Sequence, residues 1–307
     1  MPIKAQIIVP VYRPDERFLL LLNGLRQQNI NPLPLLVLNS GGADKYKIEL
    51  SALNAEIYNV ASAEFNHGGT RQRGIDICPD KDIYIFFTQD AVPADENTLG
   101  NLIAALADEH IGAAYGRQLP QSDANASEIF ARRFNYGTVS VKRSLSDAPQ
   151  YGLKTAFLSN SFAAYRADAL EEVGGFPSHT ILCEDMYVAA KMLLAGWQIA
   201  YVAEAEVYHS HNNTLAQLFR RYFDIGVFHA REAWLRQTFG AAEGSGLAFV
   251  GEELKYLFHH APLDIPMMFL RDFVKFIAYK LGLNEKYLPQ AWKQKMGLSK
   301  TFWRDKI

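Results

Sequence analysis

Short apolar runs alternate with amphipathic segments along the first part of the chain. Residues 15–28 carry apolar side chains at helical spacing between the apolar runs 6–12 and 34–39. The run 83–87 is apolar or aromatic at every position, as in a strand that is covered on both faces of a sheet. Strands that alternate with helices are typical of a parallel sheet with helices on both faces. We therefore expect an α/β fold with a mostly parallel sheet whose first strands are 6–12, 34–39, 55–60 and 83–87.

The pattern changes after residue 117 and again after residue 211. Residues 118–156 contain turn formers and scattered charges and are the least regular part. After Asn212 only helical spacing is found. We therefore expect a sheet domain over 1–211 and a helical C-terminal region over 212–307. Further strands are expected at 111–116, 160–166 and 199–208, and helices at 96–108, 167–173 and 184–194.

The composition is that of a globular protein, with 49% hydrophobic and 21% charged residues among 307. Cys78 and Cys183 lie far apart, which argues against a disulfide scaffold or a zinc cluster and fits a reducing compartment. Residues 1–6 do not resemble a secretory signal, and no run approaches the ~18 apolar residues of a membrane span. We expect a cytoplasmic protein.

The net charge of -2 is unevenly distributed. Residues 1–211 carry an excess of acidic side chains, which argues against nucleic-acid binding, and 212–307 carry an excess of basic and aromatic ones. Within 262–282, charged residues lie on one helical face and apolar residues on the other. This helix could lie on a membrane surface, pack on the sheet domain or meet a second subunit, and all three interpretations stay open. The apolar set is Phe269, Leu270, Phe273, Val274, Phe276 and Ile277, and the charged set is Arg271, Asp272 and Lys275.

Polar groups follow each of the first four expected strands. Because the carboxyl ends of parallel strands meet at one edge of a sheet, these groups are expected at one ligand site, where a nucleotide would lie. They are Pro10, Val11, Tyr12 and Arg13 after the first strand, Asn39 and Ser40 after the second, Asn66 and His67 after the third, and Gln89 and Asp90 after the fourth.

Two glycines, Gly68 and Gly69, open a helix after the third strand. Backbone N–H groups at a helix start favour a phosphate oxygen, and Arg71 could add charge-assisted hydrogen bonds. The alternative is a tight turn into a packed helix.

Carboxylates and histidines stand at the ends of other elements. Asp90 could hold a divalent cation that holds a diphosphate, or it could cap a turn. Glu184 and Asp185 open a helix, where carboxylates are favoured by the helix dipole alone. His209 and His211 are two apart at a strand end and point to the same side, towards a metal or a phosphate, unless they are structural.

Together these motifs resemble family 2 glycosyltransferases with the GT-A fold, a Rossmann-like fold that binds nucleotide-diphospho-sugars. The resemblance covers about residues 3–230. Its generic parts are the strand 7–12 and the strand-terminal Asp90; Gly174-Gly175-Phe176, Glu184-Asp185 and 209–211 follow in the family's order. The segment 65–71, Phe-Asn-His-Gly-Gly-Thr-Arg, is similar to the signature of bacterial rhamnosyltransferases that use dTDP-L-rhamnose.

The resemblance implies a donor half at about 1–117, an acceptor half at about 118–211, and a role for each candidate residue. Asp185 would be the general base, beside Glu184, and Asp90 with His209 or His211 would hold Mg²⁺ or Mn²⁺. Asn39 stands where the family usually has an Asp that contacts the nucleotide, which weakens the expected contact to the nucleobase. Thr88 stands where the metal-binding motif usually has its first Asp, which weakens the expected metal site. The donor would be bound by Pro10, Val11, Tyr12, Arg13, Asn39, Ser40, Asn66, His67, Gly68, Gly69, Arg71 and Gln89.

The function so implied is an inverting, metal-dependent glycosyltransferase that moves L-rhamnose from dTDP-β-L-rhamnose to a saccharide hydroxyl. The acceptor would be lipid-linked and part of an O-antigen or capsule type of polysaccharide, which suits an enzyme at the inner face of the cytoplasmic membrane. A UDP- or GDP-sugar donor is the nearest alternative. A sugar nucleotidyltransferase would need a glycine-rich loop that 9–14 lacks, and a non-catalytic binding protein would not need Asp90 and Asp185.

Overall fold

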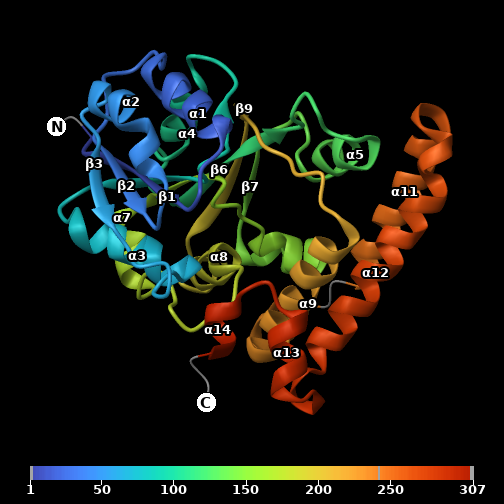
Figure 1. Ribbon diagram of the computed structural model, residues 1–307. Coiled ribbons are helices and arrows are strands. Elements are labelled where there is room, and N and C mark those ends of the chain that lie inside the picture. Colours follow the sequence, from blue (N-terminus) through green and yellow to red (C-terminus); the bar gives the residue numbers. More distant parts are fainter. Residues whose placement is uncertain (1–2, 241–242, 305–307) are drawn as a thin grey trace.

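The computed structural model describes residues 3–240 and 243–304. In this part of the chain nine strands form one sheet, which crosses the molecule in Figure 1. Its first half is parallel, as the sequence predicted, and its strands lie in the order β3-β2-β1-β4. These strands are β1 (Ala5–Val11), β2 (Leu35–Asn39), β3 (Glu56–Asn59) and β4 (Ile83–Phe87).

The second half makes the sheet mixed rather than mostly parallel. β8 (Phe162–Arg166) runs antiparallel between β4 and β6 (Ile111–Leu119). The reason is that the chain between β6 and β8 leaves and re-enters the sheet at the same edge. β9 (Gln198–Tyr208) is parallel to β6, and β5 (Val92–Pro93) and β7 (Val141–Arg143) pair with it antiparallel. The carboxyl ends of β1, β2, β4, β6 and β9 therefore share one edge.

Helices cover both faces of the sheet, and successive strand residues alternate between two cores. Ile8 and Phe86 pack on one face, while Ile7 and Ile85 pack on the other. The segment 118–156, expected to be irregular, is largely folded. The helices of the sheet domain are α1 (Glu16–Arg26), α2 (Lys47–Ala52), α3 (His67–Ile77), α4 (Thr98–Ala105), α5 (Ala126–Asn135), α6 (Ala148–Tyr151), α7 (Ala167–Glu172) and α8 (Glu184–Leu194).

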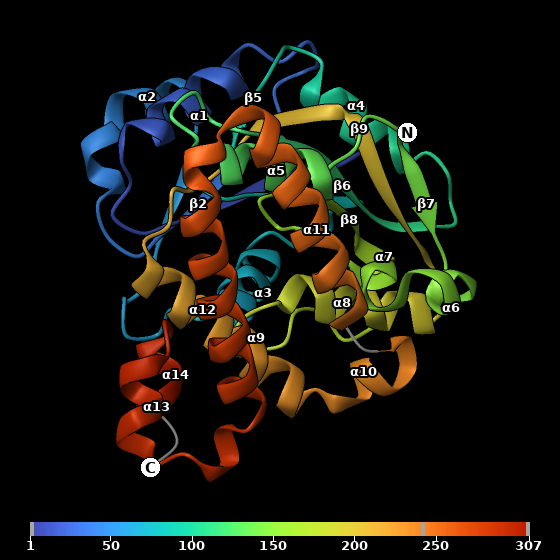
Figure 2. The same ribbon diagram turned by 90° about the vertical axis from the view of Figure 1, so that its right-hand side faces the viewer.

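The C-terminal region is helical, as expected, and is tied to the sheet domain. α9 and α12 cross so closely that a side chain at Gly226 would collide with the carbonyl of Tyr279. α11 packs on α5, where Phe249 meets the rings of Phe130 and Phe134, and Figure 2 shows the two helices face to face. The helices are α9 (Leu215–Arg231), α10 (Ala233–Phe239), α11 (Glu243–His260), α12 (Ile265–Leu283), α13 (Gln290–Met296) and α14 (Lys300–Arg304).

Both cysteines are free. Among the described residues, no helix combines the length and the apolar character needed to cross a bilayer.

Candidate active site

Asp90, His209 and His211 converge at the carboxyl edge of the sheet. Oδ1 of Asp90 lies 3.6 Å from Nε2 of His209, and Oδ2 lies 3.3 Å from Nε2 of His211. The two Nε2 atoms are 3.2 Å apart, and one ligand atom from each of the three residues falls within 4.8 Å of the others. The structure therefore brings together all three residues that the sequence named as candidate metal ligands. Both histidines direct Nε2 towards the carboxylate of Asp90.

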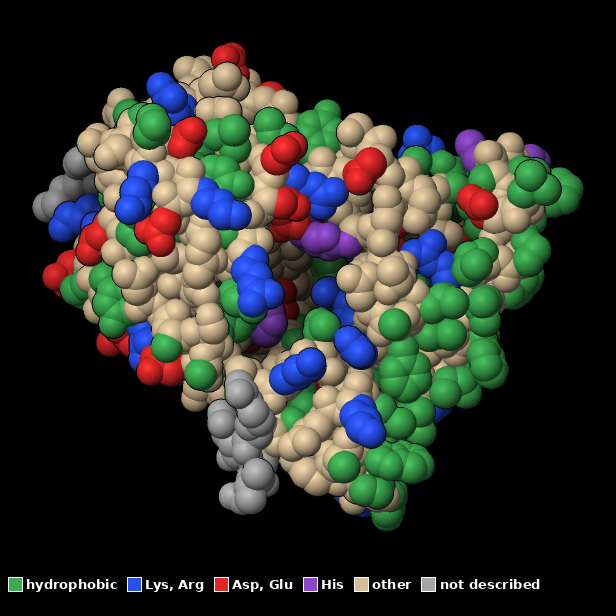
Figure 3. Space-filling view, viewed as in Figure 1, with side chains coloured by type: hydrophobic (Ala, Val, Ile, Leu, Met, Phe, Trp, Pro, Cys, Tyr) green, Lys and Arg blue, Asp and Glu red, His purple; other side chains and the backbone are tan. Residues whose placement is uncertain are grey.

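The chemistry of this cluster suits a divalent cation. Burial lowers the pKa of His209 well below its usual value and also lowers that of His211, so both rings are held neutral, the form that binds metals. Two imidazole nitrogens and one carboxylate fit Mn²⁺ better than Mg²⁺, which prefers oxygen ligands only. Figure 3 shows a hollow in the middle of this face of the molecule, where histidine, basic and acidic side chains meet.

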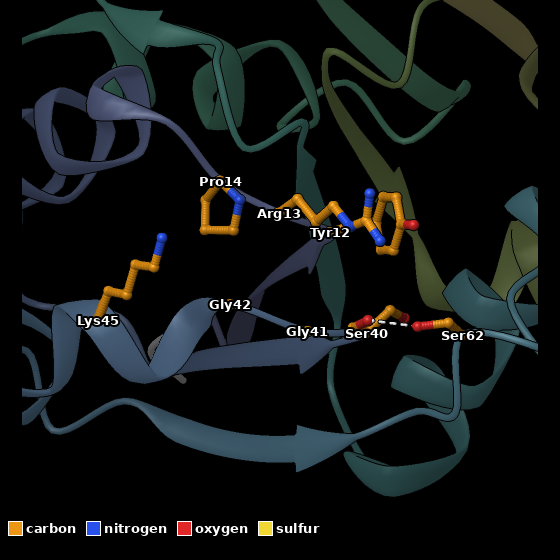
Figure 4. A pocket seen from close by; sticks show the side chains of 8 residues that line it. All are labelled: Tyr12, Arg13, Pro14, Ser40, Gly41, Gly42, Lys45 and Ser62. Atoms are coloured by element: carbon orange, nitrogen blue, oxygen red, sulfur yellow. Dashed lines mark hydrogen bonds between the residues drawn. The ribbon is translucent and has the colours of Figure 1, made fainter.

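A cavity of about 520 Å³ opens at the ends of β1 and β2, where Tyr12 is hydrogen-bonded to Gln89, the residue before Asp90. Figure 4 shows its lining, with Tyr12 and Arg13 on one side and Ser40 on the other. Arg13 adopts a positive φ of 47°, a conformation that costs about 1–3 kcal/mol in a residue with a side chain. Strain of this kind is typical of ligand sites. The complete lining is Tyr12, Arg13, Pro14, Ser40, Gly41, Gly42, Lys45 and Ser62.

Two residues expected to contact the donor instead shape this cavity. Gln89 Oε1 accepts the N–H of Tyr12 at 2.8 Å, and its Nε2 donates to the carbonyl of Tyr12 at 3.1 Å. Asn39 Oδ1 accepts the N–H groups of Gly41 and Ala43, which folds the loop after β2. Because Gln89 precedes Asp90, it also joins the cavity to the metal cluster.

Pro10 and Val11 differ in what they can offer a ligand. Val11 is fully buried and its side chain packs in the core, so only its backbone faces the edge. Pro10 is half-buried. Tyr12, by contrast, is 46% exposed and is the aromatic surface that β1 supplies to the cavity.

Asp185 stands at the start of α8 and is half-buried. Its carboxylate accepts the N–H of Asn160 at 3.2 Å and that of Met186 at 2.8 Å. Burial, and then the negative charge of Glu184, raise the pKa of Asp185 to about 6. Cys183, the residue before α8, has a strained φ of 57° that sets the direction in which the chain enters the helix. A carboxylate with this pKa can accept a proton near neutral pH.

The segment 65–71 makes mostly internal contacts. Asn66 caps α3, with Oδ1 accepting the N–H of Gly69 at 2.8 Å, so that N–H is already occupied. A side chain at Gly68 would collide with the carbonyl of Pro177. Arg71 is 4% exposed, and its Nη1 lies 2.9 Å from Glu184. This geometry favours the packed-helix interpretation of the glycines and a structural role for Arg71.

Within residues 3–240 and 243–304 the His67 ring makes no hydrogen bond, although the carbonyl of His67 accepts one from Arg71 Nη1 at 2.9 Å. His67 is half-buried, its ring packs edge-on against Phe65, and burial lowers its pKa. A neutral ring at this place can still meet a ligand oxygen.

The sequence analysis assigned no role in the site to four residues that the structure places around these groups. Lys45 and Ser62 line the cavity, because the loops after β2 and β3 fold over it. Gln118 and Asn160 hold His209 and Asp185, respectively. Gln118 lies in the stretch that looked irregular, so no periodic signal marked it.

The chain matches the family described as glycosyl transferase family group 2 over residues 89–280. It belongs to that family and is a glycosyltransferase. It is 45% identical to the O-antigen chain rhamnosyltransferase RfbN of Salmonella typhimurium, over 98% of this chain and 96% of that protein. It is 42% identical to the O-antigen chain rhamnosyltransferase WbaN of Salmonella anatum, over 97% and 95%.

Solved structures of glycosyltransferases share the fold. The mannosyltransferase PcManGT of Pyrobaculum calidifontis, in complex with GDP-Man and Mn²⁺, superposes with a TM-score of 0.62 at 15% identity, over 92% of this chain and 88% of that one. Residues 1–349 of S. aureus TarS give a TM-score of 0.53 at 14% identity, over 92% and 91%. These likenesses confirm the expected GT-A type of fold.

Proposed function

We propose that this enzyme transfers L-rhamnose from dTDP-β-L-rhamnose to a hydroxyl of a saccharide, in the assembly of an O-antigen type of polysaccharide. Both curated relatives carry rhamnosyltransferase names at 45% and 42% identity over nearly the whole chain. The geometric observation that carries the proposal is the convergence of Asp90, His209 and His211 next to the cavity at Tyr12. That arrangement suits a nucleoside in the cavity and a diphosphate at the cluster.

In this proposal Asp90, His209 and His211 hold Mn²⁺, which would supply positive charge against the negative charge that develops on the leaving diphosphate. The two nitrogen ligands support Mn²⁺ over Mg²⁺. Among the described residues this cluster contains one carboxylate, so we infer that oxygens of the donor would supply the remaining ligands.

Asp185 acts as the general base in the proposed reaction. It accepts the proton of the acceptor hydroxyl as that oxygen attacks C1 of the sugar and the bond from C1 to the diphosphate breaks. A single displacement inverts the anomeric centre, so a β-linked donor gives an α-L-rhamnoside. The backbone N–H of Asn160 and of Met186 orient the carboxylate for this step.

The acceptor is proposed to be lipid-linked, and the face of α12 supports this. The outward side of the helix is more apolar than its inward side. Inward, Lys275 Nζ lies 2.9 Å from Asp272 Oδ1, and Arg271 donates to the carbonyl of Asn213 at 3.1 Å. Outward are Phe269, Leu270, Phe273, Phe276 and Ile277, all between 37% and 62% exposed. A helix that faces only water carries the opposite pattern.

We propose that this face rests on an anionic membrane surface at the inner side of the cytoplasmic membrane. Phe258 and Leu263, 66% and 93% exposed, extend it beyond α12. In Figure 3 the apolar strip runs along the right-hand edge, and lysine and arginine side chains lie between it and the central hollow. Apolar side chains beside basic ones match the chemistry of anionic headgroups over acyl chains.

The donor assignment is tested by thermal shift with dTDP, UDP and GDP, each with and without Mn²⁺. We expect dTDP with Mn²⁺ to raise the melting temperature most, because binding to the folded state alone stabilises it. A larger shift with UDP or GDP would replace the dTDP-sugar by that donor class. The transfer itself is then checked with dTDP-L-rhamnose and a membrane extract that carries lipid-linked saccharide.

A further inference from the structure

Gln118, near the end of β6, is 2% exposed, and both ends of its amide are engaged. Its Oε1 accepts a hydrogen bond from Arg132 Nη1 at 2.6 Å and lies 2.9 Å from His209 Nδ1. Its Nε2 donates to Ser159 Oγ at 2.9 Å. A buried side chain tied to three separate elements has one orientation only.

These partners determine which way the amide points. A guanidinium has donors only, so the atom of Gln118 that faces Arg132 must be the oxygen. The same oxygen faces His209 Nδ1, and an oxygen of this kind cannot donate. His209 Nδ1 therefore carries the proton. The opposite ring atom, Nε2, keeps its lone pair.

That lone pair points at the metal cluster, since Nε2 is the atom 3.6 Å from Asp90 and 3.2 Å from His211. The backbone N–H of His209 also donates to the carbonyl of Leu119 at 2.9 Å, so β6 holds this residue at two points. The side chain of His209 is 10% exposed, whereas that of His211 is 42% exposed. His209 is the preorganised ligand of the pair.

We propose that Gln118 is a positioning residue that fixes His209 in the Nδ1–H tautomer and thereby presents Nε2 to a divalent cation. This inference rests on the proposed metal site and adds to it a residue outside the ligand set. Partners that hold a metal-binding histidine by its other nitrogen commonly contribute about 10–100-fold to metal affinity.

The same side chain connects the two ends of the proposed reaction. Ser159, which accepts from Gln118, precedes Asn160, whose N–H donates to Asp185. Gln118 therefore contacts both His209, a proposed metal ligand, and Ser159, whose neighbour Asn160 is hydrogen-bonded to Asp185, the proposed base.

Two substitutions separate the role of the acceptor oxygen of Gln118 from the role of the size of its side chain. Gln118→Met keeps the length of the side chain and removes the acceptor. Gln118→Glu keeps an acceptor for both Arg132 and His209. Gln121→Met is the matched control, because the side chain of Gln121 reaches only the carbonyl of Tyr208.

The first measurement is the dissociation constant of Mn²⁺ by electron paramagnetic resonance in the presence of dTDP. We expect Gln118→Met to weaken binding about 10–100-fold, and Gln118→Glu and Gln121→Met to stay within a few-fold of the unsubstituted protein. Equal affinity in Gln118→Met, with an unchanged circular dichroism spectrum and with binding weakened in Asp90→Asn, would overturn the inference.

The second measurement needs no metal. The ¹⁵N chemical shifts of the His209 ring in the metal-free protein report the tautomer directly. We expect Nδ1–H in the unsubstituted protein and a mixture in Gln118→Met; a mixture in both would overturn the inference. If Asp90→Asn binds Mn²⁺ normally while the tautomer depends on Gln118, the proposed metal site fails and the positioning of His209 stands.

Discussion

Arg71 and Glu184 form a buried ion pair that joins α3 to the first turn of α8. Nη1 of Arg71 lies 2.9 Å from Oε1 of Glu184, and their side chains are only 5% and 6% exposed. Asn160 also donates to this oxygen at 3.0 Å. Burial would raise the pKa of Glu184, but the charges of Arg71 and His67 and the hydrogen bond from Asn160 together lower it. Since Asp185 follows Glu184 directly, the pair determines where the proposed base stands.

Breaking this pair should destabilise the protein strongly. Arg71→Met or Glu184→Gln leaves one partner buried without its counter-charge or its strongest hydrogen bond. We expect a loss of about 3–5 kcal/mol in the free energy of unfolding, measured by urea denaturation. Arg73→Met is the control, because Arg73 pairs with Glu64 at the surface of the same helix, and we expect it to change stability by less than about 1 kcal/mol.

The alternative role of Arg71 gives the opposite result. If Arg71 binds the diphosphate, Arg71→Met would weaken dTDP binding while leaving the urea midpoint unchanged. That outcome would restore the role implied by the resemblance.

The activity should depend on the ionisation of Asp185. Its pKa of about 6 means that the base form decreases tenfold for each pH unit below that value. We expect kcat/KM to fall about fivefold between pH 6 and pH 5, and about tenfold for each further pH unit, whereas an aspartate of ordinary pKa would remain mostly ionised at pH 5. Nucleotide binding must be measured at the same pH values, because protonation of the histidines would also reduce it. A profile that is flat down to pH 4.5 would exclude Asp185 as the base.

Asp185→Asn tests the same role at fixed pH. The amide has one oxygen, so it can accept only one of the two N–H groups, of Asn160 and Met186, that donate to the separate oxygens of Asp185, and it cannot take the proton. We expect turnover to fall by about 10²–10⁴-fold, with the thermal shift by dTDP and Mn²⁺ unchanged. Near-normal turnover would assign the proton to another group.

The metal site should prefer Mn²⁺ to Mg²⁺ and depend on all three of its ligands. We expect Asp90→Asn, His209→Ala and His211→Ala each to weaken Mn²⁺ binding by about tenfold or more, since a coordinating atom is lost. His110→Ala, at an exposed turn, is the control. Full transfer activity after complete chelation would contradict the proposal.

Much of the fold followed from the sequence, because buried parallel strands leave continuous apolar runs. The strands β1, β2 and β4 were visible in this way, and β9 was visible from its alternation of apolar and polar positions. The order of the polar groups at the carboxyl ends of these strands was visible too. The direction of β8 was not visible, since a strand's pattern does not record which way its neighbours run. The folded segment around α5 was also missed, because its contacts are with distant aromatic residues.

The positions of the site residues were predictable for residues that follow the carboxyl ends of strands. They were not predictable where a side chain turns into the protein interior. Asp90, His209 and His211 follow their strands directly, so topology alone brings them together. Arg71 looked like a phosphate ligand because its neighbours in sequence are glycines. Its direction depends on Glu184, which is more than a hundred residues away, and no local pattern encodes that pair.

The apolar face of α12 should bind anionic membranes. Burial of one phenylalanine side chain contributes about 1.5–3 kcal/mol, so replacing two should reduce binding by more than about tenfold. We expect the unsubstituted protein to sediment with vesicles of phosphatidylcholine and phosphatidylglycerol, and less with phosphatidylcholine alone. The double variant Phe273→Glu with Phe276→Glu should remain in the supernatant.

Ile48→Glu controls for the loss of any exposed apolar side chain, because Ile48 is 83% exposed on α2, outside the C-terminal region. We expect it to bind vesicles normally. Size-exclusion chromatography with light scattering decides between the two occupants of the face. A stable dimer that Phe273→Glu dissociates, together with no vesicle binding, would assign the face to a second copy of the chain and overturn the membrane proposal, because one apolar surface cannot be covered by both partners at once.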